Sequence, residues 1–253
     1  MEMIPDSVWK EIKTIIPMKK SLVGRPECDA RLALNGIFFV LRSGVQWRNL
    51  PDLYGPPSTI HGKFRRWVKA GVFDEIMKIA TQAYKRNALH DDHWLAVDTS
   101  HSKAPFADWS GNNPTDRCKR GVKKIVVTNR YGAPLAVCAG ASNIHDSRLL
   151  KPAIDALGSN KEQHLRVLAA DSAFDAKALR RYCKRKRLLL VASTNVRRRK
   201  NVQKFYVKGR WVIERTFGWL AWYRGLKICW SKMLESFVAF LQLAASLQLF
   251  RMA

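Results

Sequence analysis

Four carboxylates in the second half of the chain have the type and position to do chemistry: Asp98, Asp146, Asp171 and Glu214. Asp98 follows the apolar run WLAV and Asp171 follows VLAA, so each stands where a buried strand is expected to end. Functional side chains of open α/β sheets gather at the carboxyl ends of strands. A cap on the next turn is the plain alternative for each Asp alone. Together with Glu214 on a later helix, Asp98 and Asp171 indicate a single site at which three carboxylates converge.

Converging carboxylates repel each other unless a divalent cation lies between them. Oxygen ligands of this kind suit Mg²⁺ or Mn²⁺. A pair of such ions can activate an attacking water or hydroxyl and stabilise the leaving oxygen of a phosphodiester. The residue types therefore point to a two-metal site acting on a phosphate backbone.

Glu214 stands alone among positive charges, since no other acid lies between Asp175 and Glu235. Fourteen Lys or Arg residues fall between Lys177 and Arg210, with no acid among them. Arg210, four residues before Glu214, offers a simple helical ion pair as the alternative role. In that order the pair is worth only a few tenths of a kcal/mol.

The net charge is +25 and the pI about 10.3, which favours a polyanionic partner such as nucleic acid. Residues 96–253 hold 30 basic and 10 acidic residues and so carry most of this charge. The longest apolar run, residues 237–250, is too short for a membrane span and predicts a buried helix. The five cysteines are scattered, and MEMIPDSVWKEIKTIIP is unlike a secretory signal. We expect free thiols, a cytoplasmic location and no membrane partner.

Helical spacing dominates residues 1–90, which we interpret as a helical DNA-binding domain resembling a helix-turn-helix. Apolar residues recur with helical period in PDSVWKEIKTIIP and in RLALNGIFFVLRSG. A further helix pair is expected to break near Gly71. Arg65 and Arg66 lie on it, in FRRW. A generic helical cap is the alternative that pattern alone leaves open.

The pattern of residues 91–253 changes to strands and then to alternating strands and helices. Strands are expected at residues 93–100, at 165–174 and 188–194, and in a hairpin over 123–142 turning at Asn129-Arg130-Tyr131-Gly132. Helices are expected near residues 146–158, at 175–186 and, as a long helix, from about Arg210. The order β-β-β-α-β-α-β-α predicts a mixed sheet with flanking helices.

The segments AVDTSHSKA, LAADSAFDA and RWVIERTFGWLAWYRGL resemble those of the DDE transposases of bacterial insertion sequences. ASNIHDS and the N-terminal LRSGVQWRNLPDLYGPPSTIHGKFRRWVKAGVF are also similar to segments of that family. The resemblance implies an RNase H-like fold, in which Asp98, Asp171 and Glu214 are the catalytic metal ligands of two Mg²⁺ or Mn²⁺ ions. It further implies double-stranded DNA partners, the terminal inverted repeats and the target. Because two ends must be held together, we expect a homodimer in the DNA complex.

The sequence departs from the wider family around Glu214. The pattern Tyr-x2-Arg-x3-Glu-x6-Lys is met at Arg210, but Val207 stands in the Tyr position and Ala221 in the Lys position. Arg224 or Lys227 would then replace the phosphate contact of that Lys. Between Val191 and Arg210 there is no room for the β-rich insertion of some relatives, so a compact catalytic domain is expected.

The leading hypothesis is a transposase that cleaves DNA at element ends and joins the freed 3′-hydroxyls to target DNA. DNA contacts are predicted at eight basic residues: Arg65, Arg66, Arg197, Arg198, Arg199, Lys200, Arg210 and Arg224. Supporting contacts behind the metal ligands are predicted for His101, His145 and Asp146. Most aromatics near Glu214 are expected to pack, with Trp219 or Trp222 as candidates for base stacking. A DNA-binding protein without catalysis, or an RNase H-like nuclease without strand transfer, are the alternatives.

Overall fold

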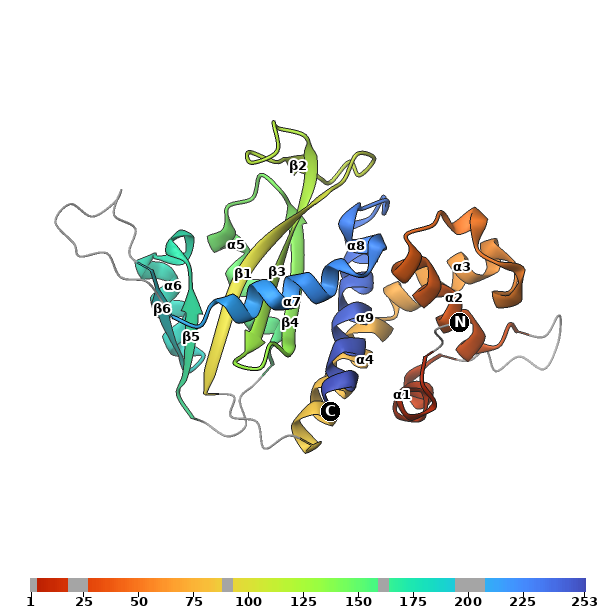
Figure 1. Ribbon diagram of the computed structural model, residues 1–253, viewed down its shortest axis with the longest axis horizontal. Helices are drawn as coiled ribbons and strands as arrows, with labels where there is room; N and C mark the ends of the chain where they lie inside the picture. The colour runs from red at the N-terminus through yellow and green to blue at the C-terminus, as the bar shows by residue number, and fades with distance from the viewer. Residues whose placement is uncertain (1–3, 18–26, 88–92, 159–163, 194–207) are drawn as a thin grey trace.

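The computed structural model describes residues 4–17, 27–87, 93–158, 164–193 and 208–253 and consists of a helical region beside a mixed sheet (Figure 1). The helical region contains α1 (Asp6–Ile12), η1 (Lys13–Ile15), α2 (Ala30–Ser43), η2 (Trp47–Asn49), η3 (Asp52–Tyr54), α3 (Pro57–Lys69) and α4 (Val72–Asn87). The strands are β1 (Trp94–Lys103), β2 (Gly111–Asn112), β3 (Arg120–Asn129), β4 (Pro134–Ala141), β5 (Arg166–Ala170) and β6 (Leu188–Ala192). The later helices are α5 (Asp146–Ala156), η4 (Ser172–Phe174), α6 (Lys177–Arg185), α7 (Trp211–Ala221), α8 (Arg224–Lys227) and α9 (Leu234–Met252).

Two helices of the first part end at the glycines that their sequences predict. Asp29 caps α2, with its Oδ1 accepting from the backbone N–H of Leu32 at 2.7 Å, and Gly44 closes the helix at φ 71°. The break between α3 and α4 falls at Gly71, also at φ 71°, as expected. Left-handed backbone of this kind favours glycine, which carries no Cβ to clash.

The sheet has the order β4-β3-β1-β5-β6, with the short β2 paired to β3. β1 lies at its centre, antiparallel to β3 and parallel to β5, and β6 extends the parallel half. Helices α7 and α9 cover one face and α5 and α6 the other (Figure 1). This arrangement confirms the predicted fold class, a mixed α/β sheet with flanking helices behind a helical N-terminal region.

Side chains alternate along β1 and β5, so neighbouring residues point to opposite faces of the sheet. Leu95 and Val97 lie in the apolar cluster on the α5 and α6 side, whereas Ala96 lies in the cluster on the α7 and α9 side. Asp98 therefore faces α7 and α9. In β5, Ala169 belongs to that same side, so Asp171, two residues later, also faces α7.

Helix α9 joins the helical region to the sheet. It packs against α4 on one side and β4 on the other, and it stands between the two parts in Figure 1. A helix that is apolar all round is expected to be buried, and ten of its residues are, including Phe237, Leu241 and Leu249. One apolar cluster consequently runs from Ile4 through α9 to the sheet. The boundary near residue 90 stays a prediction.

Expectations about the C-terminal helix and the strands were wrong in detail. The long helix expected from Arg210 ends at Ala221, and the chain resumes as the short α8 and then α9. The interruption coincides with a bridge to the end of β1, where the Cys229 N–H donates to the Lys103 carbonyl at 2.7 Å. β1 also continues to Lys103 rather than ending at residue 100, because β3 remains paired with it that far. The strand expected over residues 165–174 ends as β5 at Ala170, where Asp171 caps η4.

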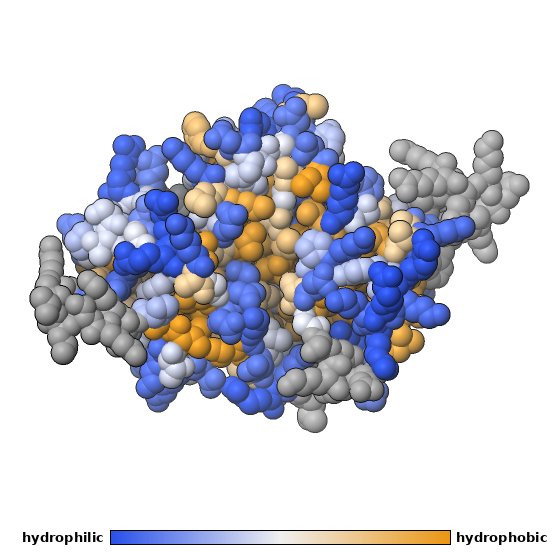
Figure 2. Space-filling model, turned by 180° about the vertical axis from the view of Figure 1, so that it is seen from behind, coloured by the Kyte–Doolittle hydropathy of each residue, from blue (hydrophilic) through white to orange (hydrophobic). Residues whose placement is uncertain are grey.

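Charged side chains cover much of the surface. Viewed from behind, hydrophilic residues form most of the rim, and apolar ones gather toward the middle, between the helical region and the sheet (Figure 2). Within the part of the chain that the structure describes, no helix is long and apolar enough to cross a membrane.

Candidate active site

The pairing of β1 with β5 brings Asp98 and Asp171 together. In this parallel ladder Ala96 is the partner of Ala169, and each Asp lies two residues further along its own strand direction. Neighbouring strands are about 4.8 Å apart, so the two carboxylates emerge side by side on the α7 face. The pairing of β1 with β5 ends at Ala96 and Ala169, and the Asp98 and Asp171 side chains just beyond it are half-buried.

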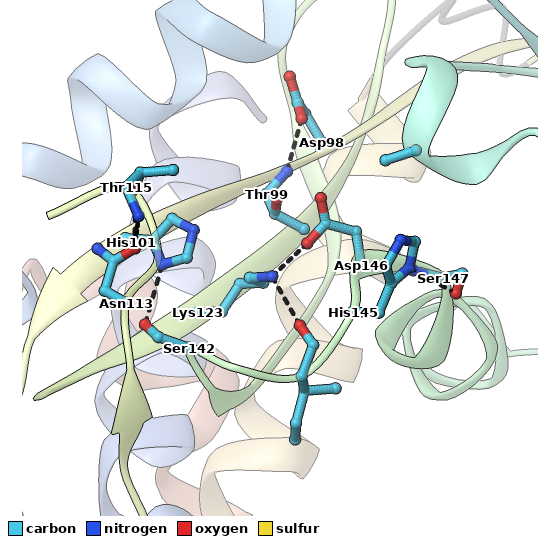
Figure 3. Close-up of polar contacts among 12 residues, drawn as sticks. Asp98, Thr99, His101, Asn113, Thr115, Lys123, Ser142, His145, Asp146 and Ser147 are labelled. Atoms are coloured by element: carbon cyan, nitrogen blue, oxygen red, sulfur yellow. Dashed lines mark hydrogen bonds and ion pairs between the residues drawn. The ribbon is translucent and has the colours of Figure 1, made fainter. Parts of the chain in front are cut away.

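Asp98 is held by two donors. Its Oδ1 accepts from the Thr99 backbone N–H at 2.8 Å, shown in Figure 3, and its Oδ2 accepts from Arg210 Nη2 at 2.7 Å. Burial raises the pKa of the Asp98 carboxyl and the Asp171 charge adds to the rise, while the Thr99 N–H and the Arg210 guanidinium oppose it. Two carboxylates and one guanidinium thus share a partly desolvated site.

Asp171 is oriented by the turn that follows β5. Its Oδ1 accepts from the Ala173 backbone N–H at 2.9 Å and caps η4. A side-chain cap of this kind fixes the carboxylate against its own backbone. The cap that is the plain alternative for this Asp is therefore present, and it leaves Oδ2 without a hydrogen bond from the described residues.

Helix α7 carries Arg210 at its N-cap position and Glu214 one turn later, about 6 Å further along the axis. Gly209, at φ 85°, sets the entry to this helix, and a Cβ there would meet the Trp94 ring at 3.2 Å. Glu214 is exposed. Within the described residues, no three His, Cys, Asp or Glu side chains lie close enough to hold a metal ion, so this structure does not bring Glu214 to the Asp pair.

The turn between β3 and β4 holds the middle of α7. The Thr216 hydroxyl donates to the Gly132 carbonyl at 2.8 Å, and Arg215 Nη2 donates to the Tyr131 carbonyl at 2.7 Å. The Arg215 guanidinium also lies between two indoles, 4.9 Å from the centroid of Trp211 and 4.8 Å from that of Trp219. Trp219 consequently has a packing partner, whereas Trp222 is 69% exposed.

The three residues predicted to support the metal ligands contact other groups on the α5 side of the sheet (Figure 3). His101 Nδ1 hydrogen-bonds the Ser142 hydroxyl at 2.9 Å, and His145 caps α5 through Ser147. Asp146 forms an ion pair with Lys123, whose ammonium also donates to the Ile144 carbonyl at 2.6 Å. Burial and the neighbouring Lys123 charge lower the pKa of His101. Sequence analysis missed Lys123, although a lysine inside a central strand is itself an unusual signal.

The predicted DNA-binding residues have different surroundings. Arg65 and Arg66 are exposed on α3, and Arg224 is exposed at the start of α8. Arg210 is engaged with Asp98 instead of being exposed to a ligand. Arg197, Arg198, Arg199 and Lys200 lie outside the described residues.

The donor set suits a hard divalent cation. Asp98 and Asp171 present carboxylate oxygens from adjacent strands, each anchored at one oxygen by a backbone N–H. Carboxylate oxygens are what Mg²⁺ and Mn²⁺ prefer. Arg210 forms an ion pair with Asp98 and so places a positive charge beside this donor set.

Comparisons with known proteins agree with this geometry. Residues 90–249 match the family described as "Transposase DDE domain", and residues 4–77 match one described as "Putative transposase of IS4/5 family". The chain is 35% identical over 144 residues to a protein of Burkholderia cepacia named "Putative transposase for insertion sequence element IS402", covering 54% of this chain and 67% of that protein.

Solved structures with a similar arrangement are more distant. The catalytic core of BIV integrase is 16% identical with a TM-score of 0.35, covering 60% of this chain and 84% of that one. A pre-cleavage Mos1 transpososome is 9% identical with a TM-score of 0.31, covering 92% and 81%. The family matches, rather than these likenesses, carry the assignment. DDE transposases are phosphoryl-transfer enzymes that usually use a divalent metal, and this chain belongs to their family, in its IS4/5 branch.

Proposed function

We propose that this chain catalyses transposition of an insertion sequence by cutting DNA at the element ends and joining the freed 3′-hydroxyls to target DNA. The observation that carries the proposal is the Asp98–Asp171 pair at adjacent strands, balanced by Arg210, on a chain of charge +25. The family membership gives the reaction class, DNA transposition.

Asp98 and Asp171 would hold a divalent ion between them, and Glu214 would complete the ligand set from α7. When bound, Mg²⁺ or Mn²⁺ supplies activation of the attacking oxygen and charge stabilisation of the leaving oxygen. The backbone N–H groups of Thr99 and Ala173 keep the two carboxylates in fixed orientations. Preorganised oxygens of this kind cost little reorganisation when the reaction begins.

Arg210 has two roles in this proposal. While it donates to Oδ2 of Asp98 it limits repulsion between the paired carboxylates. With a cation held by the two carboxylates, the Arg210 guanidinium would bind a phosphate oxygen, for which its fork of donors is well suited. Glu214 lies one turn further along the same helix, so a small shift of the start of α7 would move both side chains together.

DNA would be held by the basic surface. Arg65, Arg66 and Arg224 are exposed, and each phosphate they neutralise makes binding more dependent on salt. The element ends and the target are the proposed duplex partners. Because two ends must be held together, we propose a homodimer in the DNA complex.

The test uses the single variants Asp98→Asn, Asp171→Asn and Glu214→Gln, with Asp74→Asn, an exposed carboxylate on α4, as the matched control. Each of the three should lose Mg²⁺-dependent joining of a 3′-hydroxyl end while still shifting end DNA in a gel. The control should do both. A variant that still cleaves removes its residue from the site.

The wild-type reaction separates the alternatives. Nicking without joined product would make the chain a nuclease without strand transfer. Binding of end DNA without any nicking in Mg²⁺ or Mn²⁺ would make it a DNA-binding protein without catalysis. Joined product of the expected length supports the transposase.

A further inference from the structure

A cavity of about 670 Å³ lies where the helical region meets the far end of β1. Its lining comes from the end of α2 and the chain that follows it into η2, from α3, from the loop after β1, from α8 and its connection to α9, and from α9 itself. This volume is within the range of small-molecule and cofactor sites. The six lining residues that matter here are Trp47, His61, Arg65, Phe106, Trp230 and Lys232.

Aromatic rings form two parts of the lining. On the inner side the Trp47 ring stacks on His61, with centroids 4.8 Å apart and planes at 26°. On the outer side Phe106 stacks on Trp230, with centroids 5.5 Å apart and planes at 25°. Phe106 is 62% and Trp230 49% exposed. Large exposed aromatic surface of this kind marks a binding site more often than a packing site.

The positive charges around the cavity favour a negatively charged ligand. Arg65 and Lys232 are exposed in the lining, and no carboxylate is among the lining residues. Burial, and then the Arg65 charge, lower the pKa of His61. Its planar ring stacks on Trp47 and extends the flat aromatic lining. A ligand that combines a flat ring with a negative group fits these observations.

We propose that this cavity binds one unpaired nucleotide of a DNA strand, with its base stacked on the aromatic lining and its phosphate contacted by Arg65 and Lys232. Stacking on aromatics accepts any base, because every base has a π-face. The inference rests on the proposed function, since it takes the ligand to be DNA that the chain already binds. It adds a site away from the carboxylates and a preference for locally opened DNA.

The position of the cavity agrees with a strand that also reaches the Asp pair. β1 runs from Asp98 to Lys103, about 17 Å at the rise of a strand, and Lys103 pairs with Ile228, two residues before Trp230. About five nucleotides at 3.4 Å each cover that length. A nucleotide in the cavity would therefore sit several positions from the phosphate at Asp98.

The experiment compares single-stranded and duplex probes. A 12-nucleotide strand containing 2-aminopurine reports stacking by quenching of its fluorescence, and the duplex of the same sequence reports general DNA binding. In Trp230→Ala and Phe106→Ala, affinity for the single strand should fall about five- to a hundredfold and the quenching should disappear. Duplex affinity should stay within about twofold. Trp230→Phe should keep most of the single-strand affinity.

The matched control is Tyr131→Ala, because Tyr131 is 40% exposed at the opposite end of the sheet. It should change neither affinity nor quenching. Lys232→Gln tests the phosphate contact and should lower the slope of log K against log salt by about 0.7 for the single strand. Tyr131 and Lys232 are both exposed, so Tyr131→Ala and Lys232→Gln should keep the wild-type melting temperature.

Each contrary result has its own meaning. Unchanged single-strand affinity and quenching in Trp230→Ala, with duplex binding intact, overturns the nucleotide site and leaves the proposed function standing. Failure of the wild type to bind duplex contradicts the proposed function, and the single-strand arm still decides the cavity. A change of oligomeric mass in Trp230→Ala without a change in quenching makes the cavity a protein interface and overturns the inference.

Discussion

Arg210 Nη2 donates to Oδ2 of Asp98 at 2.7 Å across 112 residues of sequence. This contact ties the start of α7 to the central strand, and it places a permanent positive charge beside a carboxyl whose pKa burial raises. The same helix carries Glu214, so one contact influences both the ionisation of one predicted metal ligand and the position of another.

Removing the Arg210 charge should shift the pH dependence of DNA cleavage. Asp98 must lose its proton to bind a metal, and the guanidinium opposes the rise of its pKa. In Arg210→Ala the pKa should rise further, so the acid limb of the pH–rate profile should move to higher pH. Arg210→Lys keeps the positive charge and should therefore shift the acid limb of the profile less than Arg210→Ala does. Identical acid limbs in wild type and Arg210→Ala would contradict this role.

Asp98→Asn should raise the melting temperature at pH 7 although it abolishes activity. Because the pKa of Asp98 is raised, the folded state holds its proton more tightly, and stability falls as pH rises through the folded pKa. The neutral amide introduced by Asp98→Asn removes the free-energy cost of burying an ionised carboxylate at pH 7. Each kcal/mol recovered corresponds to about 2–4 °C for a chain of this size.

Calorimetry at several pH values checks this prediction. The gain should shrink below the ordinary Asp pKa, where both states are protonated. Asp52→Asn, an exposed acid in the helical region, should leave the melting temperature unchanged. A lower melting temperature for Asp98→Asn at pH 7 would show that the bond from Arg210 outweighs the burial cost.

Gly132→Ala should destabilise the fold and lower activity together. Gly132 has φ 84°, and a Cβ there would lie 3.0 Å from the Thr216 hydroxyl and 3.2 Å from the Trp219 ring. The left-handed backbone alone costs about 1–2 kcal/mol for a residue with a Cβ. The contact with α7 adds to this and displaces the helix that carries Glu214. Urea unfolding and strand-transfer rates measure the two effects.

Gly71→Ala is the matched control, because Gly71 has φ 71° and nothing lies within 4 Å of its added Cβ. It should show the backbone cost alone. Equal destabilisation by the two substitutions would mean that α7 tolerates the extra methyl group.

Lys124→Met should stabilise the protein at neutral pH. Burial lowers the pKa of Lys124 from its ordinary value of about 10.5 to about 8, and its ammonium donates only to the Leu226 carbonyl at 3.3 Å among the described residues. A shift of this size corresponds to about 3 kcal/mol held against the folded state at pH 7. Wild-type stability should therefore rise between pH 8 and 10.5, relative to the variant. A gap between the two that stays constant with pH would contradict this.

Asp146→Asn should destabilise the fold by leaving the buried Lys123 charge without its carboxylate. The Lys123 side chain is 7% exposed and that of Asp146 is 21% exposed. Breaking a fully buried pair costs about 3–5 kcal/mol, which is an upper bound here. Adding Lys123→Met should restore much of the stability. Activity that returns with stability assigns Asp146 a structural role, whereas activity that stays lost supports the predicted role beside the metal ligands.

The sequence alone determined the order of strands and helices and the positions of Asp98 and Asp171. These follow from patterns of period 2 and 3.6, which are local because a strand or helix repeats over a few residues. The break at Gly71 and the start of α7 after Arg210 were predictable for the same reason. Both Asp residues face α7 because each is an even number of residues from a buried alanine of that face.

Only the tertiary structure decided which distant groups meet. Arg210 was predicted to pair with Glu214 or to bind phosphate, yet it bonds Asp98, because the packing of α7 across β1 sets that distance. The helix expected to continue past Ala221 is interrupted there, and beyond the short α8 the Cys229 N–H donates to the Lys103 carbonyl at the end of β1. The aromatic cavity is lined by separate segments between Val40 and Phe240, and no single stretch of sequence reveals it. Contacts between residues a hundred positions apart depend on how the layers pack, which local periodicity does not encode.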